Sequence, residues 1–106
     1  MIEPLTPAEL KARLERGDDL CVLDVREDEE LEICSLDGAV HIPMSELSVR
    51  ITELDPDRPT VCVCHHGIRS ANVALALEQF DFVELYNLSG GVDRWATEVD
   101  PEMPRY

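Results

Sequence analysis

Two short apolar runs, separated by segments with a helical pattern, constrain the fold of this chain most. The runs are L-C-V-L-D-V at 20–25 and T-V-C-V-C at 60–64. Apolar side chains at successive positions are typical of strands buried on both faces, as in a parallel sheet. Parallel strands need crossover connections, which the intervening segments are long enough to supply. The pattern therefore predicts an α/β fold with a small, mainly parallel β-sheet flanked by helices on both faces.

Other elements follow from capping residues, helical spacing and turn signals. Thr6, Pro7 and Glu9 form an N-cap, a first-turn proline and a capping-box acid, which indicates a helix. In another predicted helix, Ser70 is placed to cap an early amide. The tail 100–106 contains two prolines and is expected to be irregular. The remaining predictions are helices at 7–16, 27–33, 45–54, 69–80 and 92–97, and strands at 38–43 and 84–88.

Size and charge limit the organisation and the partners. With 106 residues, 44% of them hydrophobic, the chain can form one modest core, so we expect a single domain over 1–106. Its 23 acidic and 9 basic residues give a formal net charge of -14. This charge repels phosphate backbones and anionic lipid, so we expect neither nucleic acid nor a membrane as partner. An anion would need a local positive site made by backbone amides or a few Arg and His side chains.

The expected cellular location bears on the state of the cysteines. No apolar run has the length of a membrane span, and the N-terminal M-I-E-P-L-T-P lacks the features of a secretory signal. We therefore expect a cytoplasmic protein. In that reducing compartment Cys21, Cys34, Cys62 and Cys64 are expected to be free thiols.

Cys64 is the strongest candidate because it stands where a buried strand ends and a helix soon begins. Ligands of open α/β sheets bind beyond the carboxyl ends of the strands. Amides at a helix N-terminus lower the pKa of a nearby thiol below its free value of about 8.5. Gly67 allows the backbone to curl, so that the amides of 65–70 converge on one point. We expect a nucleophilic sulfur that is open to solvent and faced by these amides.

Four motifs, in their order and spacing, resemble single-domain rhodaneses across nearly the whole chain. The cysteine loop alone is a moderate signal, whereas the combination is specific. The motifs are D-V-R at 24–26, G-A-V-H-I-P at 38–43, C-H-H-G-I-R-S at 64–70 and S-G-G-V-D-R-W at 89–95.

This resemblance implies a sulfurtransferase. Cys64 would attack the outer sulfur of a donor such as thiosulfate, release sulfite and hold the sulfur as a persulfide. A thiophilic acceptor, cyanide or a thiol, would then remove it. Covalent catalysis would divide the transfer into two steps, and loop amides would stabilise negative charge in both of them. No metal or organic cofactor is implied.

The residues after the nucleophile are predicted to bind substrate: His65, His66, Gly67, Ile68, Arg69 and Ser70. At the start of a helix, the Arg69 guanidinium could orient sulfonate oxygens, and the alternative is an ion pair with a neighbouring acid. His65 and His66 are either exposed loop side chains or, for at least one of them, a contact to the anionic group of the donor.

Three further polar residues are predicted to support the structure. Asp24 and Arg26 could clamp substrate, but a structural pair at a strand end is favoured. His41 is expected to be half-buried and hydrogen-bonded to backbone, with a proton relay as the alternative. Trp95 is interpreted as a packing residue.

The remaining cysteines are predicted to be structural. Cys62 points to the same face of its strand as Cys64, which could suit a resolving or metal-binding thiol, although a buried strand cysteine is favoured. The spacing C-x-C-H-H is not a recognised closed zinc pattern. Cys21 and Cys34 lack a cationic or amide neighbour in the sequence and are interpreted as small apolar fillers.

Two rival functions remain. A cysteine phosphatase uses the same physics, but related phosphatases are expected to place five residues between Cys and Arg, whereas four separate Cys64 from Arg69. The smaller ring suits a sulfur atom better than a phosphoryl group. The other rival is a protein-docking relay or regulatory domain that passes or senses persulfide sulfur with little turnover of small donors. The acidic surface suits such docking.

Overall fold

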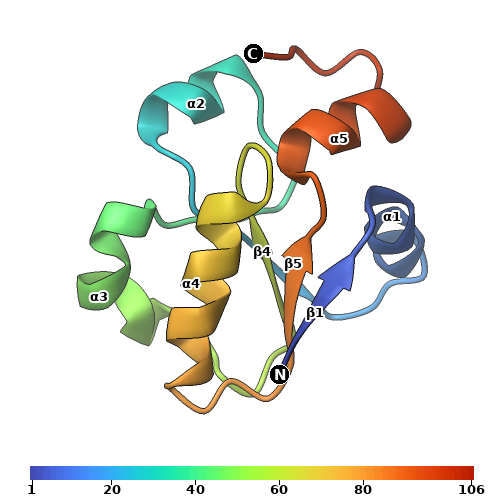
Figure 1. Cartoon of the computed structure of the whole chain (residues 1–106). Helices are drawn as coiled ribbons and strands as arrows, with labels where there is room; N and C mark the ends of the chain where they lie inside the picture. Colours follow the sequence, from blue (N-terminus) through green and yellow to red (C-terminus); the bar gives the residue numbers. More distant parts are fainter.

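Five parallel strands form one sheet in the computed structural model, which describes residues 1–106 (Figure 1). In the order β1-β5-β4-β2-β3, β4 is the central strand. The predicted α/β fold with a mainly parallel sheet is confirmed. The strands are β1 (Ile2–Leu5), β2 (Cys21–Asp24), β3 (Val40–His41), β4 (Thr60–Val63) and β5 (Leu85–Leu88).

Helices cover both faces of the sheet, as predicted. On one face, Leu10 and Val92 pack in a core cluster with Val61 of β4. On the other face, Leu47 and Val73 belong to a second cluster. The α-helices are α1 (Pro7–Glu15), α2 (Asp28–Ile33), α3 (Leu47–Arg50), α4 (Ile68–Glu78) and α5 (Gly91–Glu98). None of them is both long and apolar enough to cross a membrane.

The two apolar runs form neighbouring strands because both faces of each strand are covered. Every residue of β2 and β4 is buried. Leu23 is paired in register with Cys62, and Asp24 with Val63. The register places the ends of both strands at the same edge of the sheet, where Cys64 and Arg26 follow.

The structure contains one strand that the sequence analysis missed. β1 pairs with β5 in parallel from Ile2 to Leu5. Only Leu5 is buried in this strand, so no apolar run marks it. Pro4 is tolerated because an edge strand needs ladder hydrogen bonds on one side only.

The prediction of one continuous helix at 45–54 was wrong. The segment consists of two 3₁₀ turns, η1 (Met44–Glu46) and η2 (Ile51–Glu53), on either side of the single turn α3. β-Branched residues such as Val49, Ile51 and Thr52 lower the helix propensity there.

The start of α4 also differs from the prediction. Its N-cap is Gly67, with φ 101°, and no side chain caps the helix. Ser70 therefore lies inside the first turn, and the expected capping role is wrong. This shift frees the hydroxyl of Ser70 for the site described below.

The C-terminal tail returns from α5 toward α2 without forming a helix or strand (Figure 1). Tyr106, in this tail, donates a hydrogen bond to Glu30 of α2. The tail therefore reaches the edge of the sheet at which β4 ends.

Candidate active site

Cys64 follows β4 directly and begins the loop that leads to α4. Its sulfur accepts hydrogen bonds from the Gly67 amide at 3.1 Å, the Ser70 amide at 3.4 Å and the Ser70 hydroxyl at 3.3 Å. Sequence reasoning predicted this convergence of amides.

Gly67 is needed for the shape of this loop. Its φ of 101° is unfavourable for any residue with a side chain, and a Cβ there would meet the Leu88 carbonyl oxygen at 3.3 Å. The loop therefore packs against the end of β5 as closely as a glycine allows.

The hydrogen bonds make the Cys64 thiol more acidic than a free one. Burial alone would raise its pKa, but bonds from the hydroxyl and amide of Ser70 and from the amides of Gly67 and His66 outweigh it and lower the pKa. Cys62 has no such donors, and burial raises its pKa to about 12. Of these two thiols, Cys64 is the one prepared to act as a nucleophile.

The sulfur is less open than the sequence analysis expected. The Cys64 residue is only 1% exposed, because it continues a fully buried strand into a tightly wound loop. The amides face the sulfur as predicted, whereas its predicted openness to solvent was wrong. Access of a donor to the sulfur therefore requires the surrounding loop or side chains to move.

Asn87 on β5 is a member of the site that sequence reasoning missed. Its side-chain amide donates to the Gly67 carbonyl at 2.9 Å, and its oxygen accepts a hydrogen bond from the Ser70 hydroxyl. That hydroxyl has one proton, so it donates either to Asn87 or to the Cys64 sulfur. Asn87 therefore keeps the Ser70 hydroxyl beside the thiol, whichever of the two acceptors receives the proton. The only sequence signal was its place near the end of a buried strand.

The N-terminus of α5 holds the loop from the other side. The Val92 amide donates to the Cys64 carbonyl at 2.9 Å, and the Asp93 amide to the His65 carbonyl at 3.1 Å. At Gly91, a Cβ would stand 2.3 Å from the Cys64 carbonyl oxygen. Gly91 thus permits a close approach of the two backbones.

Asp24 and Arg26 form a pair with no exposed surface. The Arg26 guanidinium donates to Asp24 at 2.8 Å and to the Cys34 carbonyl at 2.8 Å. Burial opposes the charge on Arg26, but Asp24 and the Tyr106 hydroxyl keep its pKa above the ordinary value. This geometry suits a structural role.

His41 and Cys34 lie around this pair. The Nε2 atom of His41 is 2.6 Å from the Arg26 carbonyl oxygen, so it carries the proton and donates it. Cys34 has no cationic neighbour in the sequence, but in the fold its sulfur is 3.6 Å from Nη1 of Arg26. The contact spans eight residues and leaves no local sequence signal.

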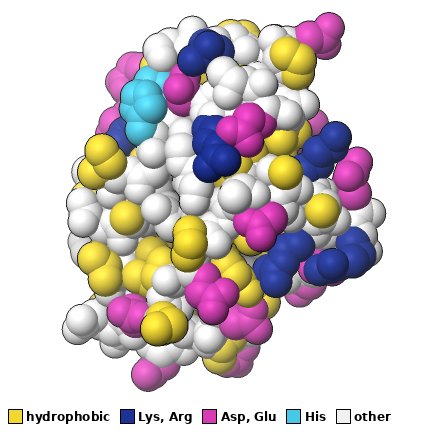
Figure 2. All heavy atoms as spheres, turned by 45° about the vertical axis from the view of Figure 1, so that its right-hand side comes forward, with side chains coloured by type: hydrophobic (Ala, Val, Ile, Leu, Met, Phe, Trp, Pro, Cys, Tyr) yellow, Lys and Arg dark blue, Asp and Glu magenta, His cyan; other side chains and the backbone are white.

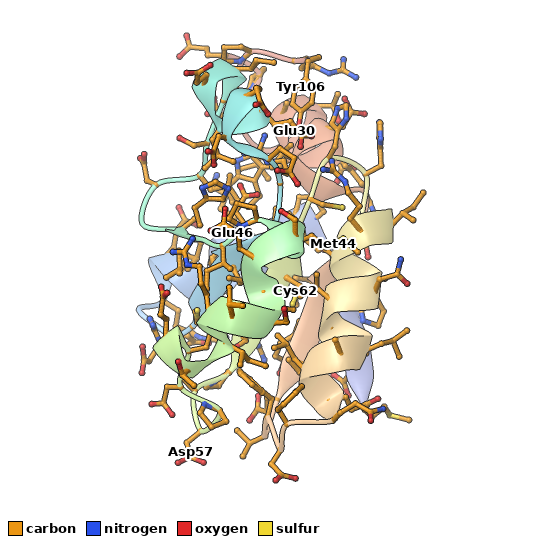
Figure 3. All side chains as sticks on the ribbon, turned by 90° about the vertical axis from the view of Figure 1, so that its left-hand side faces the viewer. Glu30, Met44, Glu46, Asp57, Cys62 and Tyr106 are labelled. Carbon is orange, nitrogen blue, oxygen red and sulfur yellow. The ribbon has the colours of Figure 1, made fainter.

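Arg69 is engaged by an acid from another element. Its Nη1 and Nη2 atoms donate to the two carboxylate oxygens of Glu30, each at 2.7 Å. Tyr106 donates to the same carboxylate at 2.8 Å. In Figure 3, Glu30 and Tyr106 lie together at one end of the molecule, far from Asp57 at the other. Sequence reasoning raised an ion pair for Arg69 only as the alternative and missed Glu30 and Tyr106.

The two histidines flank the mouth of the loop. The ring of His65 stacks on Tyr106 with a centroid distance of 3.8 Å, and burial lowers its pKa. The Nε2 atom of His65 is buried without a hydrogen-bond partner. His66 is more exposed, and its Nε2 is 3.9 Å from an oxygen of Asp93. Ile68, also predicted to bind substrate, points its side chain to solvent.

One group of side chains has the donor types of a metal site. Ligand atoms of His65, His66 and Asp93 lie within 4.8 Å of one another. Asp93 also accepts hydrogen bonds from Arg105 at 3.0 and 3.2 Å, so one of its oxygens is already engaged. The Nε2 atom of His66 and the Oδ2 atom of Asp93 are 3.9 Å apart, farther than two ligand atoms of one tetrahedral zinc ion, so these side chains would have to close around a metal.

Known proteins are similar to this chain over nearly its full length. YtwF of Bacillus subtilis, which is named as a sulfurtransferase, is 36% identical over 101 residues, covering 95% of this chain and 97% of that protein. MoeZ of Mycobacterium tuberculosis, whose name joins adenylyltransferase and sulfurtransferase, is 36% identical over 104 residues. That match covers 96% of this chain but 26% of MoeZ, so the chain corresponds to about a quarter of that larger protein.

Solved structures agree with these sequence relatives. A rhodanese-like domain protein from Staphylococcus aureus superposes with a TM-score of 0.84 at 30% identity, covering 92% of this chain and 94% of that one. Residues 6–98 match the family described as the rhodanese-like domain. The relatives named as sulfurtransferases support sulfur transfer as the general activity. The chain belongs to the rhodanese-like domain family.

Proposed function

We propose that this chain is a sulfurtransferase that carries a sulfane sulfur as a persulfide on Cys64. The observation that carries the proposal is the ring of donors from Gly67 and Ser70 on the Cys64 sulfur. These donors favour the thiolate, which is the nucleophilic form of cysteine. The same donors would stay on the inner sulfur of a Cys64 persulfide, next to the terminal sulfur that carries its negative charge.

The reaction consists of two displacements. The Cys64 thiolate attacks the outer sulfur of the donor, a new S–S bond forms, and the donor's own S–S bond breaks. The leaving group departs with the electron pair, as sulfite from thiosulfate or as a thiolate from a persulfide. An acceptor thiolate or cyanide then attacks the outer sulfur of the Cys64 persulfide and regenerates the Cys64 thiolate. No oxidant and no metal take part in this sequence.

The loop geometry favours this reaction over a phosphatase reaction. Four residues separate Cys64 from Arg69. The Arg69 fork is turned to Glu30 at 2.7 Å rather than toward the sulfur. A phosphoryl group needs several free donors around three oxygens, whereas a persulfide needs donors to a single sulfur. The donors from Gly67 and Ser70 converge on a single sulfur and so match the requirement of a persulfide.

A relay role within the same chemistry is the second candidate. The 1% exposure of Cys64 restricts access to a slender donor group, and a persulfide presented by a partner protein meets that condition. The name of MoeZ combines two activities, and this chain corresponds to about a quarter of that protein. A domain similar to this one can therefore stand beside another enzyme activity. Because the four cysteines are free, we also propose a reducing, cytoplasmic setting. We further propose that residues 1–106 act as one domain.

Intact mass spectrometry tests the persulfide directly. Incubation of the reduced protein with thiosulfate or with a small persulfide should add one sulfur, about 32 Da, which cyanide or a reductant removes. Cys64→Ser should abolish the adduct and the transfer. Cys62→Ser, the matched change two residues away within β4, should leave most of the transfer intact.

Circular dichroism of both variants verifies that each is folded. Equal loss of transfer in the two folded variants would contradict the assignment to Cys64. Absence of the adduct from the wild-type protein with every donor would remove the mechanism altogether.

A further inference from the structure

The cation nearest in sequence to the nucleophile is neutralised within the fold. Arg69 stands five positions after Cys64, and its two terminal nitrogens are both bonded to Glu30. A bidentate pair of this kind is among the stronger polar contacts in proteins. The Arg69 fork therefore has its best donors occupied before any ligand arrives.

Glu30 is itself held in place by several donors. Its carboxylate accepts from Arg69, from the Tyr106 hydroxyl at 2.8 Å and from the Glu27 amide at 2.9 Å. Tyr106 in turn accepts a hydrogen bond from Arg26 at 3.1 Å. Arg26 is anchored in its buried pair with Asp24. The Glu30 pKa falls to about 2, chiefly through the Arg69 hydrogen bond, so the carboxylate stays ionised at neutral pH.

The other charges at the mouth are also balanced. Arg105 is paired with Asp93 at 3.0 Å. Burial lowers the pKa of His65, which favours its neutral form at pH 7. Figure 2 shows histidine side chains with both acidic and basic groups near them, rather than a continuous positive field. The whole chain carries a formal charge of -14, so the long-range field repels anions.

We propose that Glu30 is a specificity-determining residue that withholds Arg69 from anionic donors, so that the site selects persulfides without a sulfonate group over thiosulfate. This inference rests on the proposed persulfide function of Cys64. It reverses the expectation that Arg69 orients sulfonate oxygens. The loop amides would face the transferred sulfur of a persulfide and of thiosulfate alike. The two donors differ in the rest of the molecule, which would meet the side chains around the loop.

The favoured half-reaction balances without a further reactant. The Cys64 thiolate attacks the outer sulfur of R–S–SH, the S–S bond of the donor breaks, and R–S⁻ leaves with the electron pair. The outer sulfur keeps its hydrogen until the amide cradle favours its loss to water. With thiosulfate the leaving group is sulfite, a dianion, and the Arg69 guanidinium that could receive it is already paired with Glu30.

Donor competition with charge-matched variants tests the inference. The two donors are thiosulfate and the persulfide of cysteamine, whose ammonium offsets the persulfide charge. The wild-type protein should have a higher kcat/KM for cysteamine persulfide by about tenfold or more, because one lost charge-assisted contact corresponds to about 1.4 kcal/mol.

Glu30→Gln should raise the ratio of kcat/KM for thiosulfate to that for cysteamine persulfide by about tenfold, mainly through a lower KM for thiosulfate. Glu29→Gln removes the same charge from an exposed neighbouring residue of α2 and should leave the ratio unchanged within about twofold. Adding Arg69→Ala to Glu30→Gln should abolish the gain, because the freed guanidinium is its source. Tyr106→Phe removes one hydroxyl that holds Glu30 and should raise the ratio by a smaller factor.

The outcomes separate the two proposals. If no donor forms the sulfur adduct, the persulfide function itself fails. If the adduct forms but wild-type protein prefers thiosulfate, or Glu30→Gln and Glu29→Gln give the same ratio, the role of Glu30 is overturned. Should Glu30→Gln fail to fold, the wild-type preference and the Tyr106→Phe ratio decide the same question.

Discussion

Cys62 and Cys64 lie two positions apart, and hydrogen-bond donors separate their chemistry. Both residues are at most 1% exposed and pack in the same cluster. Burial raises the Cys62 pKa to about 12, whereas the Ser70 and loop donors lower that of Cys64 despite burial. Reactivity at this site is therefore a property of the loop rather than of exposure.

Ser70 is the residue whose removal should move the Cys64 pKa most directly. Deprotonation makes the thiol reactive, so the alkylation rate rises with pH through the Cys64 pKa. Ser70→Ala removes the hydroxyl beside the sulfur and should shift the midpoint of the rate against pH upward, because the thiolate loses a hydrogen bond that favours it.

The measurement is the rate of iodoacetamide labelling of Cys64, read by mass spectrometry after digestion. Ser48→Ala, an exposed serine on α3, provides the control and should leave the midpoint in place. A midpoint that stays fixed in Ser70→Ala would show that the backbone amides alone set the acidity.

At the scale of elements, the site is assembled where β4, β5, α4 and α5 meet. Sequence reasoning could place Cys64 at the end of a strand and Gly67 in the turn, because apolar runs and glycines are local signals. It could not find Asn87, Glu30 or Tyr106 as site members. Their contacts join residues 17 to 76 positions apart, and nothing in a local pattern records such a meeting.

The same limit explains the errors in the fold. β1 has a single buried residue, and its pairing with β5 comes from the far end of the chain. The segment 44–53 contains helix formers and β-branched residues in mixture, so tertiary packing decides between α and 3₁₀ turns. Strong periodicity, as in α4, predicted a helix close to the observed Ile68–Glu78.

Gly91 should be the most sensitive glycine of the site, because α5 approaches the nucleophile loop there. Gly91→Ala places a Cβ 2.3 Å from the Cys64 carbonyl oxygen at φ 60°, so the loop and α5 must separate. We expect sulfur transfer to fall at least tenfold and the free energy of unfolding to drop by about 2 to 4 kcal/mol.

Gly38→Ala is the matched control. Gly38 also has a positive φ, 76°, but a Cβ there meets nothing within 4 Å. Urea unfolding should show only the cost of backbone strain, about 1 kcal/mol, with transfer retained. Similar activity losses in both variants would mean that strain, not the contact with Cys64, is responsible.

At the scale of the whole molecule, the excess of acidic residues acts on stability. A formal charge of -14 on 106 residues makes the folded chain repel itself. Raising NaCl from about 10 mM to about 300 mM shortens the screening length and should raise Tm by about 4 to 8 °C, the equivalent of about 1 kcal/mol for a chain of this size.

Differential scanning calorimetry measures this shift. At about pH 4.5, where carboxylates start to take up protons, the same salt step should raise Tm less. A salt effect of equal size at both pH values would point to salting-out of apolar surface instead of charge screening.

Placing Cys64 directly after the central strand has a consequence for motion. β4 has two strands on each side, so its amides should exchange with deuterium only through global unfolding, while the short turns at 44–53 open locally. The sulfur is thus fixed to the slowest-exchanging part of the molecule. Fluctuations that admit a donor must then arise in the loops and side chains around the sulfur, and the nucleophile keeps its position while they occur.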